Sequence, residues 1–376
     1  MKCRKYNIAM FGHKQIPSKE GGVEVVVNEL CTRMAEKGHS ITCYNRSKEK
    51  IIPLKNRIRI YNGIKIKDVF TINAKGLAAV SSSFVSTLLS AFGRYDIIHI
   101  HAEGNCAFLF VLKFMKKKSI VTIHGLDYKR SKWGGFASKY ILFGEKMAVK
   151  FADEIIVLNS WTQNYFKEKY NRDCVFIPNG VIKHNAVAAR EIYEKYSLEK
   201  DGYILFLGRL VPEKGLEYLI KAFKDVHTDK KLVIAGGSSD TDDFVNNLRS
   251  LAADDDRILF TGFASGNLLD ELFSNAYVYV LPSDLEGMPL SLLEAMSYGN
   301  CCLTSDIPEI TEVIEDKAVI FKKGDISDLI DKMQMLVDSE DTVKKYKNIS
   351  SDYICNKYNW DDVTDKTISL YDSCFD

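Results

Sequence analysis

Two carboxylates lie eight positions apart in the stretch LEGMPLSLLEAMSYG, as Glu286 and Glu294. Pro289, between them, suits the first position of a helix, where its missing N–H group needs no partner. Backbone N–H groups near the start of such a helix can bind a phosphate. Here they would belong to Gly287, Met288 and Leu290. Glu294 then lies about one turn inside the helix, where a carboxylate can accept hydrogen bonds from two vicinal hydroxyls, as on a ribose.

A pair of cations, Arg209 and Lys214, occurs in the stretch FLGRLVPEKGLEYL. Both follow an apolar run that predicts a strand, so they fall in the loop at its carboxyl end. Two cations at that position suit a diphosphate, which an arginine can bind through two parallel hydrogen bonds. A loop arginine or lysine is more often simply solvated, and that alternative stays open for this pair taken alone.

A glycine pair, Gly21 and Gly22, follows the first predicted strand in FGHKQIPSKEGGVE. The glycines of this stretch do not fit the G-x-G-x-x-G dinucleotide fingerprint. A Gly-Gly pair that opens a helix nevertheless allows an anion or a sugar to approach the partial positive charge of the helix start. A plain turn before a helix is the alternative.

These residues need strands to position them, and the chain alternates short apolar runs with amphipathic stretches, as in strand–helix units around a parallel sheet. In the first half we expect strands at 7–11, 41–45, 64–70, 96–100, 119–123, 154–158 and 174–177. In the second half we expect them at 203–208, 231–237, 257–262, 277–283, 301–305 and 318–321. The break near residue 180 predicts two doubly wound α/β domains, with a ligand-binding cleft at the carboxyl ends of both sheets.

Length and composition fit this division, since 376 residues suffice for two soluble domains. The N-terminus runs directly into an apolar strand, so we expect no signal peptide. The nine cysteines are odd in number and contain no CxxC pair, which favours reduced thiols in the cytoplasm. Because no Cys/His cluster has zinc-ligand spacing, we expect no metal.

Charge is distributed unevenly along the chain. Residues 1–185 carry 31 Lys+Arg and 14 Asp+Glu, a net charge of +17, and the remainder carries 20 and 36, a net charge of −16. The split suggests that the first domain is attracted to an anionic partner such as nucleic acid, anionic lipid or a phosphorylated substrate. Mutual attraction of the two halves is the alternative. No nucleic-acid-binding pattern accompanies the basic residues, so we expect no nucleic-acid partner.

The uncharged segment 76–93 raises the question of a membrane. Its five serines argue against a span, which needs about 20 predominantly apolar residues. Together with CAFLFVLKFMKKK (106–118), it can form an apolar and basic surface for a membrane. Alternatively, both segments are core helices of a parallel sheet. Two histidines lie at and just after the end of the strand expected at 96–100; we expect His99 in the core and leave His101 open between core and cleft.

The sequence contains the two stretches EGMPLSLLEAMSYG and GRLVPEKGL. Together they resemble the signature of the retaining, two-domain (GT-B) glycosyltransferases of glycosyltransferase family 4. That family has a glutamate pair separated by seven residues and an Arg/Lys pair after the first strand of its second domain. The resemblance runs from GGVE to the terminal WDDVTDKTISLY. It implies an acceptor-side domain (1–182), a nucleotide-sugar domain (183–357) and a C-terminal helix (358–376) that packs back on the first domain.

The resemblance also implies roles for individual residues. Arg209 and Lys214 would hold the donor diphosphate and stabilise its growing charge as the glycosidic bond breaks. Glu286 would bind hydroxyls of the donor sugar, and Glu294 the ribose. His124, in TIHGLD, matches the family histidine near the reactive carbon. The departing phosphate would take the proton of the acceptor hydroxyl on the same face, without an enzymic nucleophile and without a metal.

The remaining candidate donor-binding residues lie in loops after strands or at helix starts. They are Gly21, Gly22, Gly208, Gly236, Phe263, Gly287, Met288, Pro289 and Leu290. The stretch DTD (240–242) has the form of the metal-binding Asp-x-Asp of a different glycosyltransferase fold, but it lies in a polar loop and we do not expect it to bind metal. The segment after the second glutamate departs from the family's usual Gly-x-Pro-Val, because it reads GNCCLTSDIPEITEVI (299–314). The contacts of the loop in this segment therefore stay open.

The stretch 124–159 is similar to bacterial transferases that build capsule, exopolysaccharide or rhamnose-containing wall polymers. It implies transfer of a hexosyl or rhamnosyl group from a nucleotide-sugar to a lipid-linked or growing surface polysaccharide, at the inner face of the cell membrane. A non-catalytic sugar-nucleotide-binding subunit and a sugar-nucleotide epimerase are the alternatives.

Overall fold

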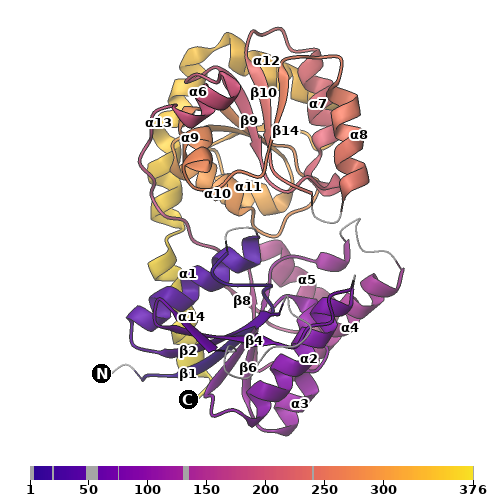
Figure 1. Cartoon of the computed structure of the whole chain (residues 1–376), viewed down its shortest axis with the longest axis vertical. Helices are drawn as coiled ribbons and strands as arrows, with labels where there is room; N and C mark the ends of the chain where they lie inside the picture. Colours follow the sequence, from indigo (N-terminus) through magenta and orange to yellow (C-terminus); the bar gives the residue numbers. More distant parts are fainter. Residues whose placement is uncertain are drawn as a thin grey trace. The chain divides into compact units, whose positions relative to one another are not determined.

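The protein is described here as a computed structural model that covers residues 4–18, 21–47, 58–74, 76–129, 135–238 and 241–375. It divides into two compact units. Unit 1 comprises residues 1–179 and 360–376, and unit 2 comprises residues 180–359. Each unit is a sheet with helices on both faces (Figure 1).

The sheet of unit 1 has the strand order β3-β4-β2-β1-β5-β6-β7-β8, parallel throughout except for the β3–β4 pair. Its strands are β1 (Asn7–Phe11), β2 (Ser40–Arg46), β3 (Ile58–Tyr61), β4 (Ile64–Val69), β5 (Ile97–His101), β6 (Lys118–Ile123), β7 (Glu154–Val157) and β8 (Val175–Phe176). Every strand expected in this half is present. Strand β3 was not expected from the sequence. The turn Asn62-Gly63 joins it to β4, and both turn residues have positive φ, as the tight hairpin turns favoured by Asn-Gly require.

The helices of unit 1 include the last helix of the chain. They are α1 (Gly22–Glu36), α2 (Leu77–Phe92), α3 (Leu109–Phe114), α4 (Gly135–Phe151), α5 (Ser160–Tyr170) and α14 (Trp360–Ser373), with short 3₁₀ turns η2 (Glu103–Cys106) and η3 (Asp127–Lys129). Helix α14 packs beside α1, where Arg33 pairs with Asp361 at 3.1 Å and Lys37 with Asp365 at 2.6 Å. The expectation that the C-terminal helix packs back on the first domain is confirmed.

Unit 2 is a fully parallel sheet with the order β11-β10-β9-β12-β13-β14. Its strands are β9 (Tyr203–Leu207), β10 (Lys231–Ala235), β11 (Ile258–Gly262), β12 (Val278–Leu281), β13 (Cys301–Ser305) and β14 (Val319–Phe321), all expected from the sequence. Its helices are α6 (Glu191–Tyr196), α7 (Leu216–Lys224), α8 (Asp242–Ala252), α9 (Asn267–Asn275), α10 (Leu290–Ser297), α11 (Pro308–Ile314), α12 (Ile326–Asp338) and α13 (Glu340–Lys357), with the 3₁₀ turn η4 (Pro212–Lys214).

Both sheets have a point at which the strand order reverses. In unit 1, β1 lies between β2 and β5; in unit 2, β9 lies between β10 and β12. The loops on the two sides of such a point diverge, so a crevice opens at the carboxyl ends of the strands, where open α/β sheets bind their ligands. A ligand site is therefore expected at the carboxyl ends of β1 and β5 in unit 1, and at those of β9 and β12 in unit 2.

Helix α4 approaches the chain at η2 through Gly144. A Cβ atom built at Gly144 would lie 2.1 Å from the carbonyl oxygen of Glu103, far inside van der Waals contact. Alanine is intrinsically favoured over glycine within a helix by about 1 kcal/mol, yet here it would push α4 away from η2.

Replacing Gly144 with alanine is therefore expected to lower the unfolding temperature by about 3–10 °C, because the forced displacement outweighs the gain in helix propensity. Thermal unfolding followed by circular dichroism measures it. Lys146→Ala, on the exposed face of the same helix, is the control and should leave the temperature within about 1 °C. An increase for Gly144→Ala would contradict the close packing of α4 on η2.

Candidate functional site

In unit 1, the glycine pair lies at the carboxyl end of β1. Helix α1 begins at Gly22, directly after the extended Gly21. Glu24 in its first turn is buried, and its Oε1 accepts a hydrogen bond from the backbone N–H of Lys14 at 2.7 Å, which ties the loop after β1 to the helix start. Sequence reasoning missed Glu24, although an acidic residue in a first helical turn is a recognisable signal.

His124 follows the end of β6 and is half-buried. Its Nε2 lies 2.9 Å from Nδ1 of His101, the last residue of β5. His99 is in the core, as expected, and His101 is also fully buried. The structure thus brings His124 and His101 together at the edge of the sheet where the strand order reverses.

In unit 2, Lys214 and Glu286 form an ion pair, each side chain only 9% exposed. The Oγ of Ser283 donates a second hydrogen bond to the same carboxylate oxygen of Glu286, at 2.6 Å. Arg209 lies half-buried in the loop after β9, five positions before Lys214. Sequence reasoning did not identify Ser283, which is an ordinary residue in the loop after β12.

Two loops hold this pair in place. The loop after β9 carries Lys214, and the loop after β12 carries Glu286. The N–H of Asp284 donates to the carbonyl oxygen of Glu213 at 2.8 Å, and the hydroxyl of Tyr218 in α7 donates to the carboxylate of Asp284 at 2.8 Å. The two loops therefore form one hydrogen-bonded layer across the carboxyl ends of β9 and β12.

Helix α10 starts one residue later than expected. Its first residue is Leu290, and Pro289 is the extended residue before it, so Pro289 caps the helix rather than beginning it. The carbonyl oxygen of Pro289 accepts from the N–H groups of Leu292 at 3.1 Å and Leu293 at 3.3 Å, which closes the first turn. Glu294 lies half-buried one turn in, as predicted, and Gly287 and Met288 are buried in the preceding loop.

The other candidate donor-binding residues end neighbouring strands. Gly208 follows β9, Gly236 follows β10 and Phe263 follows β11. Gly236 has a φ of 151°, and a Cβ there would lie 1.8 Å from the carbonyl oxygen of Gly208, so only glycine fits. Phe263 is 51% exposed. The candidates of unit 2 thus share the carboxyl edge of one sheet.

No group of three or more His, Cys, Asp or Glu side chains able to hold a metal occurs among the residues described. Of the DTD stretch, Asp240 lies outside the described residues, and Asp242 accepts a hydrogen bond from Ser238 Oγ at 2.5 Å.

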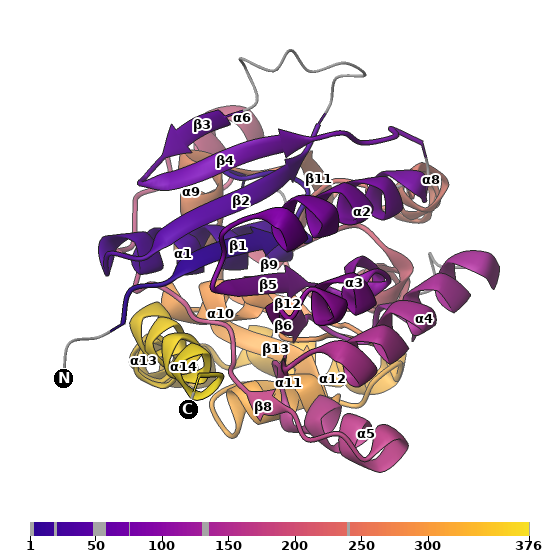
Figure 2. The ribbon, with the colours of Figure 1, turned by 90° about the horizontal axis from the view of Figure 1, so that it is seen from below.

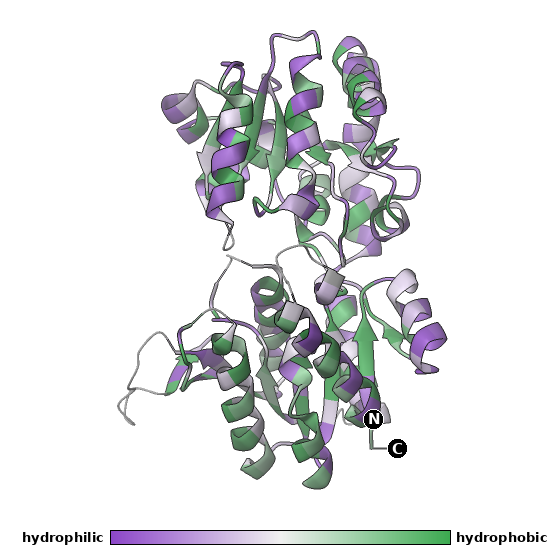
Figure 3. Cartoon of the chain, turned by 90° about the vertical axis from the view of Figure 1, so that its right-hand side faces the viewer, coloured by the Kyte–Doolittle hydropathy of each residue, from purple (hydrophilic) through white to green (hydrophobic). Residues whose placement is uncertain are grey.

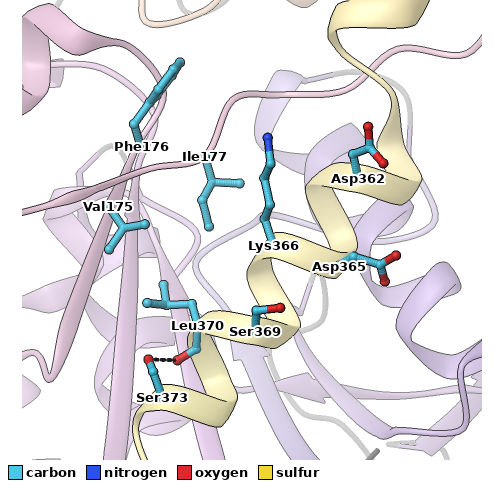
Figure 4. Close-up of a pocket in the computed structure, with 9 residues that line it drawn as sticks. All are labelled: Val175, Phe176, Ile177, Asp362, Asp365, Lys366, Ser369, Leu370 and Ser373. Atoms are coloured by element: carbon cyan, nitrogen blue, oxygen red, sulfur yellow. Dashed lines mark hydrogen bonds between the residues drawn. The ribbon is translucent and has the colours of Figure 1, made fainter.

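A cavity of about 510 Å³ occurs elsewhere in unit 1, with β8 on one side and α14 on the other (Figure 4). Its lining residues are Val175, Phe176, Ile177, Asp362, Asp365, Lys366, Ser369, Leu370 and Ser373. None of the candidate site residues lines this cavity.

Two family models match the chain, one after the other. The model for Glycosyltransferase Family 4 matches residues 20–183, and the model for Glycosyl transferases group 1 matches residues 189–352. The chain belongs to glycosyltransferase family 4. It has the GT-B fold and is a nucleotide-sugar-dependent glycosyltransferase.

Relatives of this family 4 chain include an uncharacterized glycosyltransferase of Methanocaldococcus jannaschii, 32% identical over 173 residues, a match that spans 45% of this chain and 44% of that protein. An uncharacterized 41.2 kDa protein in the cps region of Klebsiella pneumoniae is 24% identical over 94% of this chain and 97% of that protein. Among solved structures, HepE of Anabaena in complex with UDP-glucose is similar in fold, with a TM-score of 0.80 at 14% identity, covering 98% of this chain and 100% of that chain.

The ion pair of Lys214 and Glu286 predicts a measurable coupling. Removing one partner of a buried pair leaves the other charge poorly compensated. Lys214→Met and Glu286→Gln should each lower stability, and the double variant should lose less than their sum by about 1–3 kcal/mol. Denaturant unfolding of the full chain measures the four members of the cycle.

The control cycle uses Glu340 and Lys344, an exposed pair one helical turn apart in α13. Its coupling should stay within about 0.5 kcal/mol, as for other exposed helical pairs. Strict additivity at Lys214 and Glu286 would show that the two side chains are not paired in solution.

Proposed function

We propose that this chain is a retaining enzyme that transfers a hexosyl or rhamnosyl group to a hydroxyl of a lipid-linked or growing surface polysaccharide, working peripherally at the inner face of the cell membrane. The domain of residues 1–182 receives the acceptor, that of residues 183–357 binds the nucleotide-sugar, and the helix of residues 358–376 completes the first. The observation that carries the proposal is the buried Lys214–Glu286 pair at the carboxyl end of β9 and β12.

On the donor side, Arg209 and Lys214 bind the diphosphate. Negative charge grows on the departing phosphate as the glycosidic bond breaks, and fixed cations at that position lower the barrier. Glu286, anchored by Ser283 and Lys214 through one carboxylate oxygen, accepts hydrogen bonds from sugar hydroxyls. Glu294, one turn into α10, binds the ribose.

Retention follows from attack on the face that the phosphate leaves. The departing phosphate takes the proton of the acceptor hydroxyl, so the new bond forms on the side where the old one breaks and no sugar is attached to the enzyme. His124 lies beside the reactive carbon in this scheme. Its place at the end of β6, in contact with His101 at the end of β5, the strand that lies between β6 and β1, supports the assignment.

The α2 helix supports the membrane assignment because its apolar face points outward. Its buried face consists largely of hydroxyl side chains, among them Ser82, Ser83, Ser86, Thr87 and Ser90. Some of these hydroxyls donate to carbonyl groups of their own helix, as Ser82 does to Ala78 at 2.7 Å. A helix on the surface of a globular domain normally has the opposite arrangement, with its apolar face inward.

The exposed face of α2 continues onto α3, which packs beside it. The ring of Phe84 in α2 lies 5.1 Å from the ring of Phe108, the residue directly before α3. Phe92 is 75% exposed and Phe114 is 86% exposed. We call the following exposed residues the α2–α3 surface: Phe84, Leu89, Phe92, Phe110, Lys113, Phe114, Met115 and Lys116.

Figure 2 shows α2, α3 and α4 on one face of the sheet of unit 1, and much of the helical surface of that unit facing the viewer in Figure 3 is coloured as hydrophobic. Exposed aromatic side chains with lysines beside them favour binding to an anionic bilayer. No described helix is long and apolar enough to cross a membrane, and the proposal is for binding at the surface of the bilayer.

The donor site is tested by activity. Glu286→Ala should lower the rate of sugar transfer at least about 10²-fold, because a group aimed at the reacting sugar is lost. The measurement is release of nucleoside diphosphate together with appearance of glycosylated acceptor. Glu340→Ala, a change of an exposed carboxylate in α13, should leave the rate unchanged. Equal rates for Glu286→Ala and the unaltered protein would exclude this site, and an altered sugar-nucleotide made without any acceptor would indicate an epimerase.

The donor itself is found by screening UDP-, GDP- and dTDP-sugars for an increase in unfolding temperature, since a ligand that binds only the folded state stabilises it by mass action. UDP-glucose is a natural first candidate because HepE, which has a similar fold, was solved with it bound.

The α2–α3 surface is tested with vesicles. Replacing Phe92 and Phe114 together with aspartate should weaken binding to vesicles of phosphatidylglycerol and phosphatidylethanolamine about tenfold or more, because apolar contact is lost and negative charge is added. Co-sedimentation at about 0.1 M salt measures it. Met335→Asp in α12, another exposed apolar position, is the control. Unchanged binding of the double variant would exclude this surface.

A further inference from the structure

Three histidines form a stacked and hydrogen-bonded group at the ends of β5 and β6. The rings of His99 and His101 stack, with centroids 4.5 Å apart and planes inclined by 20°. Nδ1 of His101 in turn lies 2.9 Å from Nε2 of His124. His99 and His101 are fully buried, whereas His124 reaches the half-exposed edge of the sheet.

His99 is fixed at both ring nitrogens. Its Nδ1 lies 2.7 Å from the hydroxyl of Tyr371 in α14, and its Nε2 lies 2.7 Å from Oγ1 of Thr122 in β6. The ring can therefore neither turn nor shift without losing a hydrogen bond. Because His101 stacks on it, His99 provides a rigid support for the second imidazole.

His101 has one paired and one unpaired ring nitrogen. Nε2 is buried and has no hydrogen-bond partner among the residues that the structure describes. Burial lowers the pKa of His101 well below its usual value, and the neighbouring imidazoles lower it further. The ring is therefore neutral near pH 7, with one nitrogen as donor and the other as acceptor.

The single proton of His101 belongs on Nδ1. A proton on Nε2 would leave an N–H group buried without an acceptor, and unpaired buried N–H groups are rare in native proteins. With the proton on Nδ1, His101 donates to Nε2 of His124. That nitrogen is then an acceptor, so a neutral His124 must carry its own proton on Nδ1.

We propose that His101 is a positioning residue that holds His124 in the Nδ1–H tautomer and in one orientation, so that His124 offers an N–H donor to the substrate. The consequence for catalysis rests on the proposed function, in which His124 lies beside the reactive carbon. The tautomer itself is a property of the protein alone. A histidine in the wrong tautomer offers a lone pair where an N–H donor is needed. A hydrogen bond from a second group to the other ring nitrogen prevents this by fixing the tautomer.

The tautomer is tested by two-bond ¹H–¹⁵N correlation spectra of the full chain labelled at histidine. Its seven histidines make this a small set, and the spectrum of His124→Gln identifies the signal of His124. We expect His124 as the Nδ1–H form in the unaltered protein. In His101→Phe, which keeps an aromatic ring on His99, the Nε2–H form should appear. An Nε2–H form of His124 in the unaltered protein would overturn the proposal, and this measurement needs no variant of His101 to fold.

Kinetics test the consequence. His101→Phe should lower kcat about tenfold or more and change the KM for the donor less than about threefold, because geometry is lost rather than binding. His101→Asn places an amide donor near the position of Nδ1 and should restore kcat to within about threefold. Equal kcat per folded molecule in His101→Phe and the unaltered protein, or the same loss in both variants, would show that His101 only fills space.

His39 supplies a matched control. It is also a buried histidine, directly before β2, and its Nδ1 accepts a hydrogen bond from the N–H of Tyr6. His39→Gln should lower stability but change neither the tautomer of His124 nor kcat. If no donor and acceptor support any transfer, the proposed function fails, and the spectra still decide the tautomer.

Discussion

The ion pair of Lys214 and Glu286 depends on bringing together two loops whose residues are 72 positions apart. Burying two charges is unfavourable unless their geometry is good and further hydrogen bonds satisfy them. Ser283 supplies one of these bonds, and its own carbonyl oxygen is held by Ser305 Oγ at 2.5 Å. The sheet order that places β12 beside β9 makes the contact possible. A pair of this kind adds little net stability, but it fixes where each charge lies.

The strands were readable from the sequence because parallel strands are buried on both faces and appear as unbroken apolar runs. Strand β3 was not readable in this way, because it is an edge strand with exposed residues at positions 58–60. The dipeptide Asn62-Gly63 nevertheless indicated a hairpin turn. The start of α10 differed by one residue, which is the usual uncertainty of a helix end. The roles of the candidate residues remain predictions, whereas their shared location at one sheet edge follows from the topology.

Some features could not be read from the sequence. In α2, the residues Ser82, Ser83, Ser86, Thr87 and Ser90 have the spacing of one helical face, but without charges the pattern does not say which face is inward. Ser283 and His101 likewise have no local signature, because each acts on a residue that only the fold brings near. Hydropathy identifies which elements exist, and tertiary packing decides which of their side chains meet.

Unit 1 is continuous in space but not along the chain, because residues 180–359 are inserted before α14. Tyr371 of α14 lies fully buried in that unit and bonds to His99. During synthesis on the ribosome, domains generally fold in the order in which they emerge. Here unit 1, which emerges first, lacks α14 until residues 180–359 have been made, whereas unit 2 is complete before α14 is synthesised. Synthesis of unit 1 therefore begins first but is completed last, and His99 gains its hydrogen bond to Tyr371 only after α14 has been made.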